Sequence, residues 1–194
     1  HLHRIQHLCV ALARALRLPA GLVAELGYAS MLHDVGKLHV PDHILRKPGP
    51  LTTEEWEVIR QHPLQGVRIL GRHPAFSLAR EIALAHHEKW DGSGYPEGLS
   101  GESIPLSARL MAVADVYDAL ISKRVYKQAF SHEKAVAIIQ EGRGAHFDPT
   151  VVDAFEQVSQ QFRVLAEEWP DSDEEVARKA RLGDLAEAAA PGRV

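Results

Sequence analysis

Residues 106–121 read LSARLMAVADVYDALI, and they decide the fold class of this chain. Their apolar residues recur at steps of three and four: Leu110, Val113, Ala114, Val116, Tyr117 and Leu120. This spacing is typical of an α-helix with an apolar face, because an α-helix has about 3.6 residues per turn. One carboxylate, Asp115, interrupts the apolar run. An unpaired carboxylate there would be costly to bury, so Asp115 is expected to have a cation or strong hydrogen bonds.

The same helical spacing recurs on both sides of this segment. It predicts helices over residues 1–17, 19–32, 53–61, 75–87, 131–143 and 149–165, with a further one beginning near Pro63. Thr52 followed by Glu55 is the capping-box pattern of a helix start. Glycines and prolines fill residues 36–51 and 88–105, which we expect to be loops. No convincing strand pattern appears, so the predicted fold class is all-α, a compact helical bundle.

Length and composition fit one globular domain of 194 residues with a formal charge of −4. The single cysteine, Cys9, excludes an internal disulfide and a Cys-based zinc site, and favours a reducing, cytoplasmic setting. No apolar run of about 18 residues is present, so we expect no membrane contact from this domain. The balance of 26 acidic against 22 basic residues argues against a nucleic acid polymer as partner. Any anionic ligand must therefore meet local cations.

Twelve histidines stand out in this composition. Five of them, together with two aspartates, come from five separate segments and form a candidate metal set: His1, His33, Asp34, His62, His86, His87 and Asp115. Imidazoles and carboxylates suit borderline-hard metals such as iron or manganese. Two such metals about 3.5–4 Å apart can make a hydroxide from water and share the charge on a phosphoryl oxygen. The set therefore predicts hydrolysis of a phosphate ester, with Asp34 bridging the metals.

Three motifs resemble the HD-GYP domain, a branch of the HD superfamily of metal-dependent phosphohydrolases. They are HDVGK at 33–37, HHEKWDGSGYP at 86–96 and ADVYDAL at 114–120, and the resemblance extends over about residues 1–155. It implies an all-helical fold and hydrolysis of the bacterial second messenger cyclic di-GMP. In the mechanism that the resemblance implies, a metal-bridging hydroxide opens the cyclic dinucleotide to linear pGpG, and some family members hydrolyse this product further to GMP.

The resemblance also implies a role for each matching residue. The seven members of the metal set become ligands of two or three divalent ions, iron or manganese. Asp34 and Lys37 become catalytic, with Lys37 at the scissile phosphate. Tyr95, Arg124 and Lys127 join Lys37 in binding substrate.

Gly94, Tyr95 and Pro96 form the GYP signature, which the resemblance implicates in contacts with GGDEF-domain partners. Some family members carry a glutamate four residues before the first ligand histidine, and it helps to hold a third metal. That position falls before His1, so the number of metals stays open.

Three more carboxylates lie close to these motifs. Asp118, one turn after Asp115, either orients Lys37 or a ligand histidine, or only faces solvent. Glu88 and Asp91 are expected to shape the Gly-rich loop through capping hydrogen bonds.

We expect an HD-GYP catalytic domain over residues 1–165 and a helical tail over residues 166–194, with a sensory or receiver domain upstream. Two alternatives to cyclic di-GMP hydrolysis stay open at this point. One is a module that binds cyclic di-GMP or a GGDEF partner without turnover. The other is a hydrolase of another cyclic dinucleotide.

Overall fold

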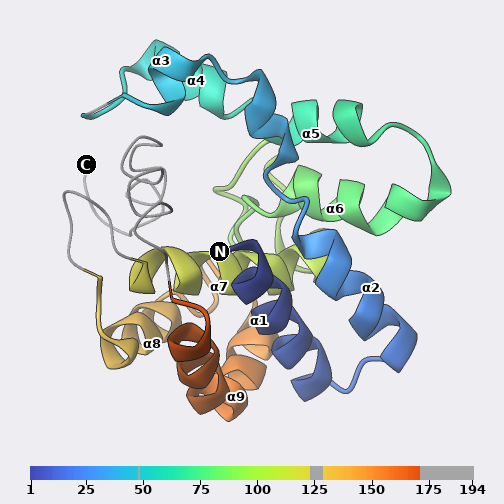
Figure 1. Ribbon diagram of the computed structural model, residues 1–194, viewed down its shortest axis with the longest axis vertical. Coiled ribbons are helices and arrows are strands. Elements are labelled where there is room, and N and C mark those ends of the chain that lie inside the picture. The colour runs from blue at the N-terminus through green and yellow to red at the C-terminus, as the bar shows by residue number, and fades with distance from the viewer. Residues whose placement is uncertain (48, 123–128, 171–194) are drawn as a thin grey trace.

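The computed structural model describes residues 1–47, 49–122 and 129–170, and it confirms the all-α prediction because no strand occurs among them. The long helices are α1 (Leu2–Ala15), α2 (Ala20–Ser30), α5 (His62–Leu70), α6 (Ser77–Ala85), α7 (Leu106–Ile121), α8 (His132–Glu141) and α9 (Pro149–Glu168) (Figure 1). The shorter elements are α3 (Asp42–Leu45), α4 (Thr53–Ile59) and the 3-10 turns η1 (Val35–His39), η2 (Pro74–Phe76) and η3 (Gly101–Ser103). No described helix is long and apolar enough to cross a membrane.

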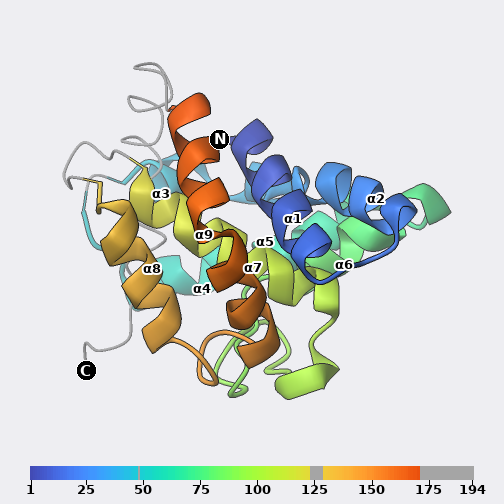
Figure 2. The same ribbon diagram turned by 90° about the horizontal axis from the view of Figure 1, so that it is seen from below.

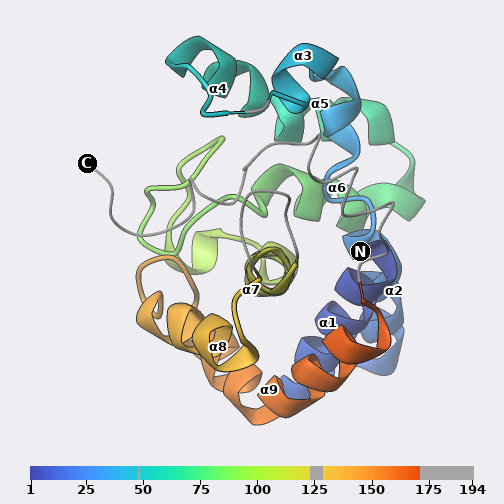
Figure 3. The same ribbon diagram turned by 60° about the vertical axis from the view of Figure 1, so that its left-hand side comes forward.

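Helix α7 is the central helix of the bundle. It packs against α1, α6, α8 and α9, and Figure 3 shows it end-on with the other helices around it. Its residues 110–114 are all buried, so apolar side chains face neighbours on every side of the helix. Near its end, the buried Tyr117 ring packs edge-on against Phe162 of α9, with ring centroids 5.0 Å apart. Helices α1 and α9 also contact each other (Figure 2).

The segment 36–51, predicted as loop, is partly helical, which corrects that expectation. It contains η1 and α3, and the buried residues Val40 and Ile44 meet Ile59 of α4 there. These three residues form a satellite cluster, covered by Leu45, Leu51 and Trp56. Short turns form between the prolines because this small apolar cluster stabilises them. In Figure 1 α3 and α4 stand at the top of the molecule, away from α7.

The remaining helix ends differ from the predicted ones by a few residues. Helix α6 begins at Ser77, after the separate turn η2, and α9 continues beyond Leu165 to Glu168. The capping box is confirmed, because Thr52 Oγ1 accepts from the Glu55 amide and the Glu55 carboxylate accepts from the Thr52 amide.

Gly36 lets η1 pack directly on the backbone of α5. A Cβ atom at this position would collide with the carbonyl oxygen of His62 and lie 2.5 Å from the Gly66 nitrogen. No side chain fits in that space. The contact therefore places Asp34 and Lys37, which flank Gly36, beside the start of α5.

Replacing Gly36 by alanine should destabilise the fold, because the methyl group forces η1 away from α5. We expect Gly36→Ala to lower the free energy of unfolding by about 1–3 kcal/mol in chemical denaturation. Gly21→Ala is the matched control, since a Cβ at this exposed position of α2 meets nothing within 4 Å. An unchanged free energy of unfolding for Gly36→Ala would contradict the packing described here.

Candidate metal centre

Four predicted ligands form a tight cluster: Asp34, His62, His86 and His87. One donor atom from each lies within 4.8 Å of all the others. Asp34 Oδ1 lies 3.3 Å from His62 Nε2 and 3.7 Å from His86 Nε2. The start of α5 and the end of α6 thus bring imidazoles to one oxygen of the Asp34 carboxylate.

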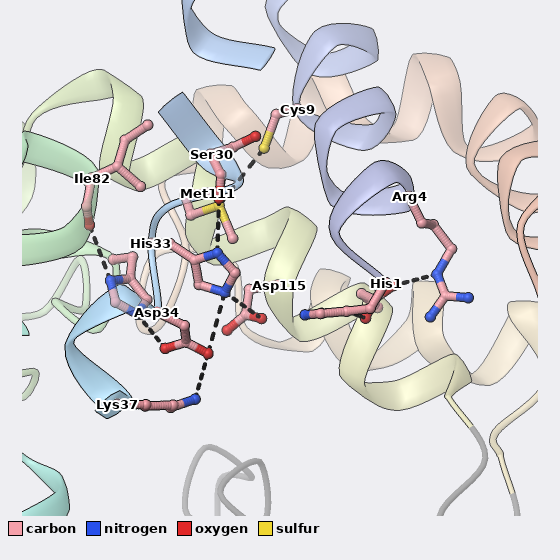
Figure 4. A network of polar contacts seen from close by, with 12 residues as sticks. His1, Arg4, Cys9, Ser30, His33, Asp34, Lys37, Ile82, Met111 and Asp115 are labelled. Atoms are coloured by element: carbon pink, nitrogen blue, oxygen red, sulfur yellow. Dashed lines mark hydrogen bonds and ion pairs between the residues drawn. The ribbon is translucent and has the colours of Figure 1, made fainter. Parts of the chain in front are cut away.

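The other carboxylate oxygen of Asp34 faces a second group of residues. Asp34 Oδ2 lies 3.4 Å from His33 Nε2 and accepts a hydrogen bond from Lys37 Nζ at 2.5 Å (Figure 4). His33 Nε2 is also 3.8 Å from Asp115 Oδ1 of α7. Asp34 therefore stands between two sets of donors, one on each of its oxygens.

Backbone carbonyl groups orient these imidazoles. Three rings direct Nδ1 at a carbonyl oxygen of the preceding helical turn: His33 at Ser30 (2.8 Å), His62 at Ile59 (2.8 Å) and His86 at Ile82 (3.0 Å). An Nδ1–H that donates to a carbonyl leaves the lone pair on Nε2, which is the arrangement usual for metal-bound histidine. In each case Nε2 is the atom nearest Asp34.

Burial keeps the imidazoles of His62 and His87 neutral. It lowers the pKa of His62 to about 3. Burial, together with the neighbouring imidazoles, also holds the pKa of His87 well below its usual range. A neutral imidazole is the form that binds a metal.

Carboxylate charge dominates on the Oδ2 side. Burial lowers the pKa of His33, but Asp34 and Asp115 outweigh it and raise that pKa to about 9, so a metal that binds there displaces a proton from its Nε2. Burial raises the pKa of Asp34, but Lys37 and His33 outweigh it and hold this pKa well below its usual range. The Asp34 carboxylate is therefore ionised and attracts cations.

Two buried atoms at the centre of this arrangement, His33 Nε2 and Asp34 Oδ1, have no hydrogen-bond partner within the part of the chain that the structure describes. Leaving buried polar atoms without partners is costly. A divalent cation would offset that cost, since imidazole nitrogen and carboxylate oxygen are its usual ligands. The residues present thus fit a divalent metal site.

A family model described as an HD domain matches residues 1–151. The chain belongs to the HD domain family. A cyclic di-GMP phosphodiesterase of Vibrio cholerae is 58% identical over 156 residues, which is 76% of this chain and 32% of that protein. A 3′3′-cGAMP-specific phosphodiesterase 2 of the same organism is 41% identical over 186 residues, 95% of this chain and 33% of that protein. The chain therefore spans about a third of the length of these two relatives.

A solved structure shares the fold of this HD domain at low sequence identity. It is an HDG“Y”P protein from Bdellovibrio bacteriovorus, with a TM-score of 0.66 and 20% identity. The alignment covers 82% of this chain and 51% of the other.

His1 lies at the edge of the centre in this HD domain. Its ring is 6.2 Å from the His33 ring (Figure 4). Its Nδ1 is 2.5 Å from Asp118 Oδ2. Asp118 is buried and also accepts from Arg4 Nε. Of the two interpretations of Asp118, the solvent-facing one is wrong, because the residue orients a histidine of the predicted set.

Arg4 of α1 is almost fully buried, and it is not among the residues predicted from the sequence. Besides Asp118, Arg4 donates to Ser122 Oγ at 2.9 Å and to the Trp169 carbonyl oxygen at 2.6 Å. A signal existed in the sequence, because Arg4 lies one helical turn before the core residue Leu8. A basic residue on an apolar face needs a buried acidic partner.

The Gly-rich loop of this HD domain is braced by Glu88, as expected. The buried Glu88 carboxylate accepts from the amides of Glu97 (2.7 Å) and Leu99 (3.0 Å). Asp91 likewise caps Ser93 through the Ser93 amide at 2.9 Å. Both carboxylates therefore shape the loop.

The GYP signature lies directly against the cluster of Asp34, His62, His86 and His87. The Tyr95 ring stacks on the His87 ring with centroids 4.8 Å apart, and the Tyr95 amide donates to the His87 carbonyl oxygen. A Cβ at Gly94 would lie 2.6 Å from that same carbonyl oxygen, so the chain needs glycine there. The peptide bond from Tyr95 to Pro96 is cis. Two predicted phosphate contacts, Arg124 and Lys127, lie outside the described residues.

Divalent metal should stabilise the folded domain, because the donor cluster exists only in the folded chain. At free metal about 100-fold above Kd, stabilisation is about 2.7 kcal/mol, which raises the melting temperature by about 5–10 °C over chelator-treated protein. The measurement is a thermal melt with and without Mn²⁺. We expect Asp34→Asn to lose most of this rise and His39→Ala, at an exposed position outside the cluster, to keep it. An equal rise in Asp34→Asn would rule out this site.

Removing the Arg4 guanidinium should destabilise the domain strongly, because it leaves the Asp118 charge buried without its cation. We expect Arg4→Met to cost about 3–5 kcal/mol in urea unfolding. Arg143→Met is the matched control, since the Arg143 and Asp153 side chains form an exposed ion pair that contributes little to the free energy of unfolding. Equal effects of the two substitutions would contradict the role given to Arg4.

Proposed function

We propose that this chain is a metal-dependent phosphodiesterase that hydrolyses cyclic di-GMP, with pGpG or GMP as the final product. One observation carries the proposal: the two oxygens of the Asp34 carboxylate face two different sets of donors. A carboxylate in this position suits a ligand shared by two cations. The similarity to proteins named as cyclic di-GMP phosphodiesterases supports the substrate.

The metal ligands in this proposal are His62, His86 and His87 on one side of Asp34, and His33, Asp115 and His1 on the other. The mixed nitrogen and oxygen donor set suits iron or manganese. When bound, two such ions lower the pKa of water and share the negative charge of a phosphoryl oxygen. The chain supplies the positions of the ligands and the contacts to the rest of the substrate.

Lys37 is the catalytic cation of this proposal. Its ammonium group donates to Asp34 Oδ2 at 2.5 Å, and the side chain is partly exposed. A phosphate that reaches Asp34 therefore also reaches Lys37. The ammonium group neutralises charge that develops on the phosphate oxygens in the transition state.

Tyr95 borders the same place and acts as a hydrogen-bond donor. Burial raises the pKa of its hydroxyl, and the nearby Asp34 and Asp115 charges raise it further. The hydroxyl therefore keeps its proton at neutral pH and can donate it to a phosphate oxygen. We assign Tyr95 to substrate binding, together with Arg124 and Lys127.

Two further parts of the proposal concern setting and partner. Gly94, Tyr95 and Pro96 are proposed to contact a GGDEF-domain partner, because this loop lies at the edge of the centre. A cytoplasmic setting is favoured by the single cysteine, Cys9, which is buried and unpaired.

A second candidate substrate is 3′3′-cGAMP. A relative named for that substrate matches 95% of this chain at 41% identity. The relative named for cyclic di-GMP is more similar, at 58% identity, and this favours cyclic di-GMP.

The proposal is tested by anaerobic incubation of iron- or manganese-loaded protein with cyclic di-GMP and, separately, with 3′3′-cGAMP. Products are separated by chromatography. We expect pGpG or GMP from cyclic di-GMP with the wild-type protein and no turnover with Asp34→Ala, whose far-UV circular dichroism should stay helical. Lys37→Met should reduce kcat by about 10²–10³-fold, because it removes one charge-stabilising donor. Full turnover by Asp34→Ala would refute the proposed centre, and binding without turnover by loaded wild-type protein would indicate a receptor.

A further inference from the structure

Arg60 contacts the metal centre through Tyr95. Its guanidinium carbon lies 4.9 Å from the centroid of the Tyr95 ring, and that ring stacks on His87 with an interplanar angle of 18°. A chain of contacts thus leads from a predicted metal ligand through an aromatic ring to a cation. A guanidinium group over an aromatic face is a favourable arrangement.

The backbone holds Arg60 in place from both sides. Its amide donates to the Trp56 carbonyl oxygen at 2.9 Å, at the end of α4. Ile59, directly before it, is buried in the satellite cluster. His62, two residues later, belongs to the metal cluster. The side chain therefore starts from a fixed point next to the centre.

The charge of Arg60 is only weakly compensated by its acidic neighbour. Its ion-pair partner is Glu57, whose carboxylate lies 3.7 Å from Arg60 Nη1, and both side chains are substantially exposed. Exposed ion pairs of this kind are weak and contribute little to stability. Lys37, in contrast, is bound to Asp34 at the reacting end of the site. Arg60 thus offers N–H donors to an anion that lies beyond the reacting phosphate.

We propose that Arg60 binds the second, non-reacting phosphate of a cyclic dinucleotide. This inference rests on the proposed function. A cyclic dinucleotide has two phosphates, so while one reacts at Asp34 and Lys37 the other needs a separate cation. The planar guanidinium suits a phosphate because two of its N–H groups can donate side by side. Tyr95 serves as the platform that holds the guanidinium.

The test compares two substrates of the metal-loaded protein. Cyclic di-GMP has two phosphates, whereas bis(p-nitrophenyl) phosphate has one phosphodiester. We expect Arg60→Gln to lower the ratio of kcat/KM for cyclic di-GMP to kcat/KM for bis(p-nitrophenyl) phosphate by about 10- to 100-fold, mainly through KM for cyclic di-GMP. Arg46→Gln is the matched control, because Arg46 has a similar exposed ion pair, with Asp42 at 3.4 Å, on the neighbouring helix α3.

The possible outcomes separate a failure of the Arg60 proposal from a failure of the proposed function. A fall in the ratio for Arg60→Gln and not for Arg46→Gln supports the proposal. An unchanged ratio, with wild-type turnover of cyclic di-GMP intact, overturns the Arg60 proposal and leaves the proposed function standing. If loaded wild-type protein hydrolyses neither cyclic di-GMP nor 3′3′-cGAMP, the proposed function fails and this inference fails with it.

Two further cases are covered by the same assay. If only 3′3′-cGAMP is hydrolysed, the same ratio is measured with that substrate, which also has two phosphates. If Arg60→Gln lowers the melting temperature, Arg60→Lys decides the question. Lysine keeps the positive charge but lacks the planar guanidinium. We therefore expect the ratio of the two kcat/KM values for Arg60→Lys to lie between those of the wild type and Arg60→Gln. A wild-type ratio would refute bidentate binding.

Discussion

The hydrogen bonds from imidazole Nδ1 to backbone carbonyl groups are the contacts on which the centre depends. Their acceptors are Ser30, Ile59 and Ile82, which lie in the last turns of α2, α4 and α6. Carbonyl groups in the last turn of a helix have no partner within the helix. The histidine rings that follow each helix bond to these carbonyl groups, beside the His33 and His86 amides that also reach Ser30 and Ile82, and the second nitrogen of each ring then points at Asp34. Three helix ends thus orient the donors of one site.

This arrangement also explains why a buried polar cluster is compatible with the bundle. The carbonyl ends of the three helices carry partial negative charge. Together with Asp34 and Asp115 they make the region favourable for cations. The central helix α7 supplies Asp115 from a segment that is otherwise apolar, so the cluster borders the core without interrupting it.

Much of the fold and of the candidate site could be predicted from local sequence. The helix at 106–121 was predicted with close to its observed bounds, because the spacing of its apolar residues is a local signal. Asp34, His62, His86 and His87 were identified from the sequence as candidate metal ligands, and they do lie together. The turns at η1 and α3 were missed, because they depend on burial of Val40 and Ile44 against Ile59, which no local pattern shows. Arg4 and Arg60 were missed because their partners, Asp118 and Tyr95, are distant in sequence.

Arg4 has a mechanical consequence for the domain. It joins the first turn of α1 to the carbonyl of Trp169 after α9, and the Trp169 ring also stacks on His3 and His7. The first and last described helices, which also pack against each other, are therefore joined at their ends as well. A displacement of the backbone at Trp169 would therefore move the Arg4 guanidinium and, through Asp118, the His1 ring. The end of α9 is in this way linked to a histidine at the edge of the candidate centre.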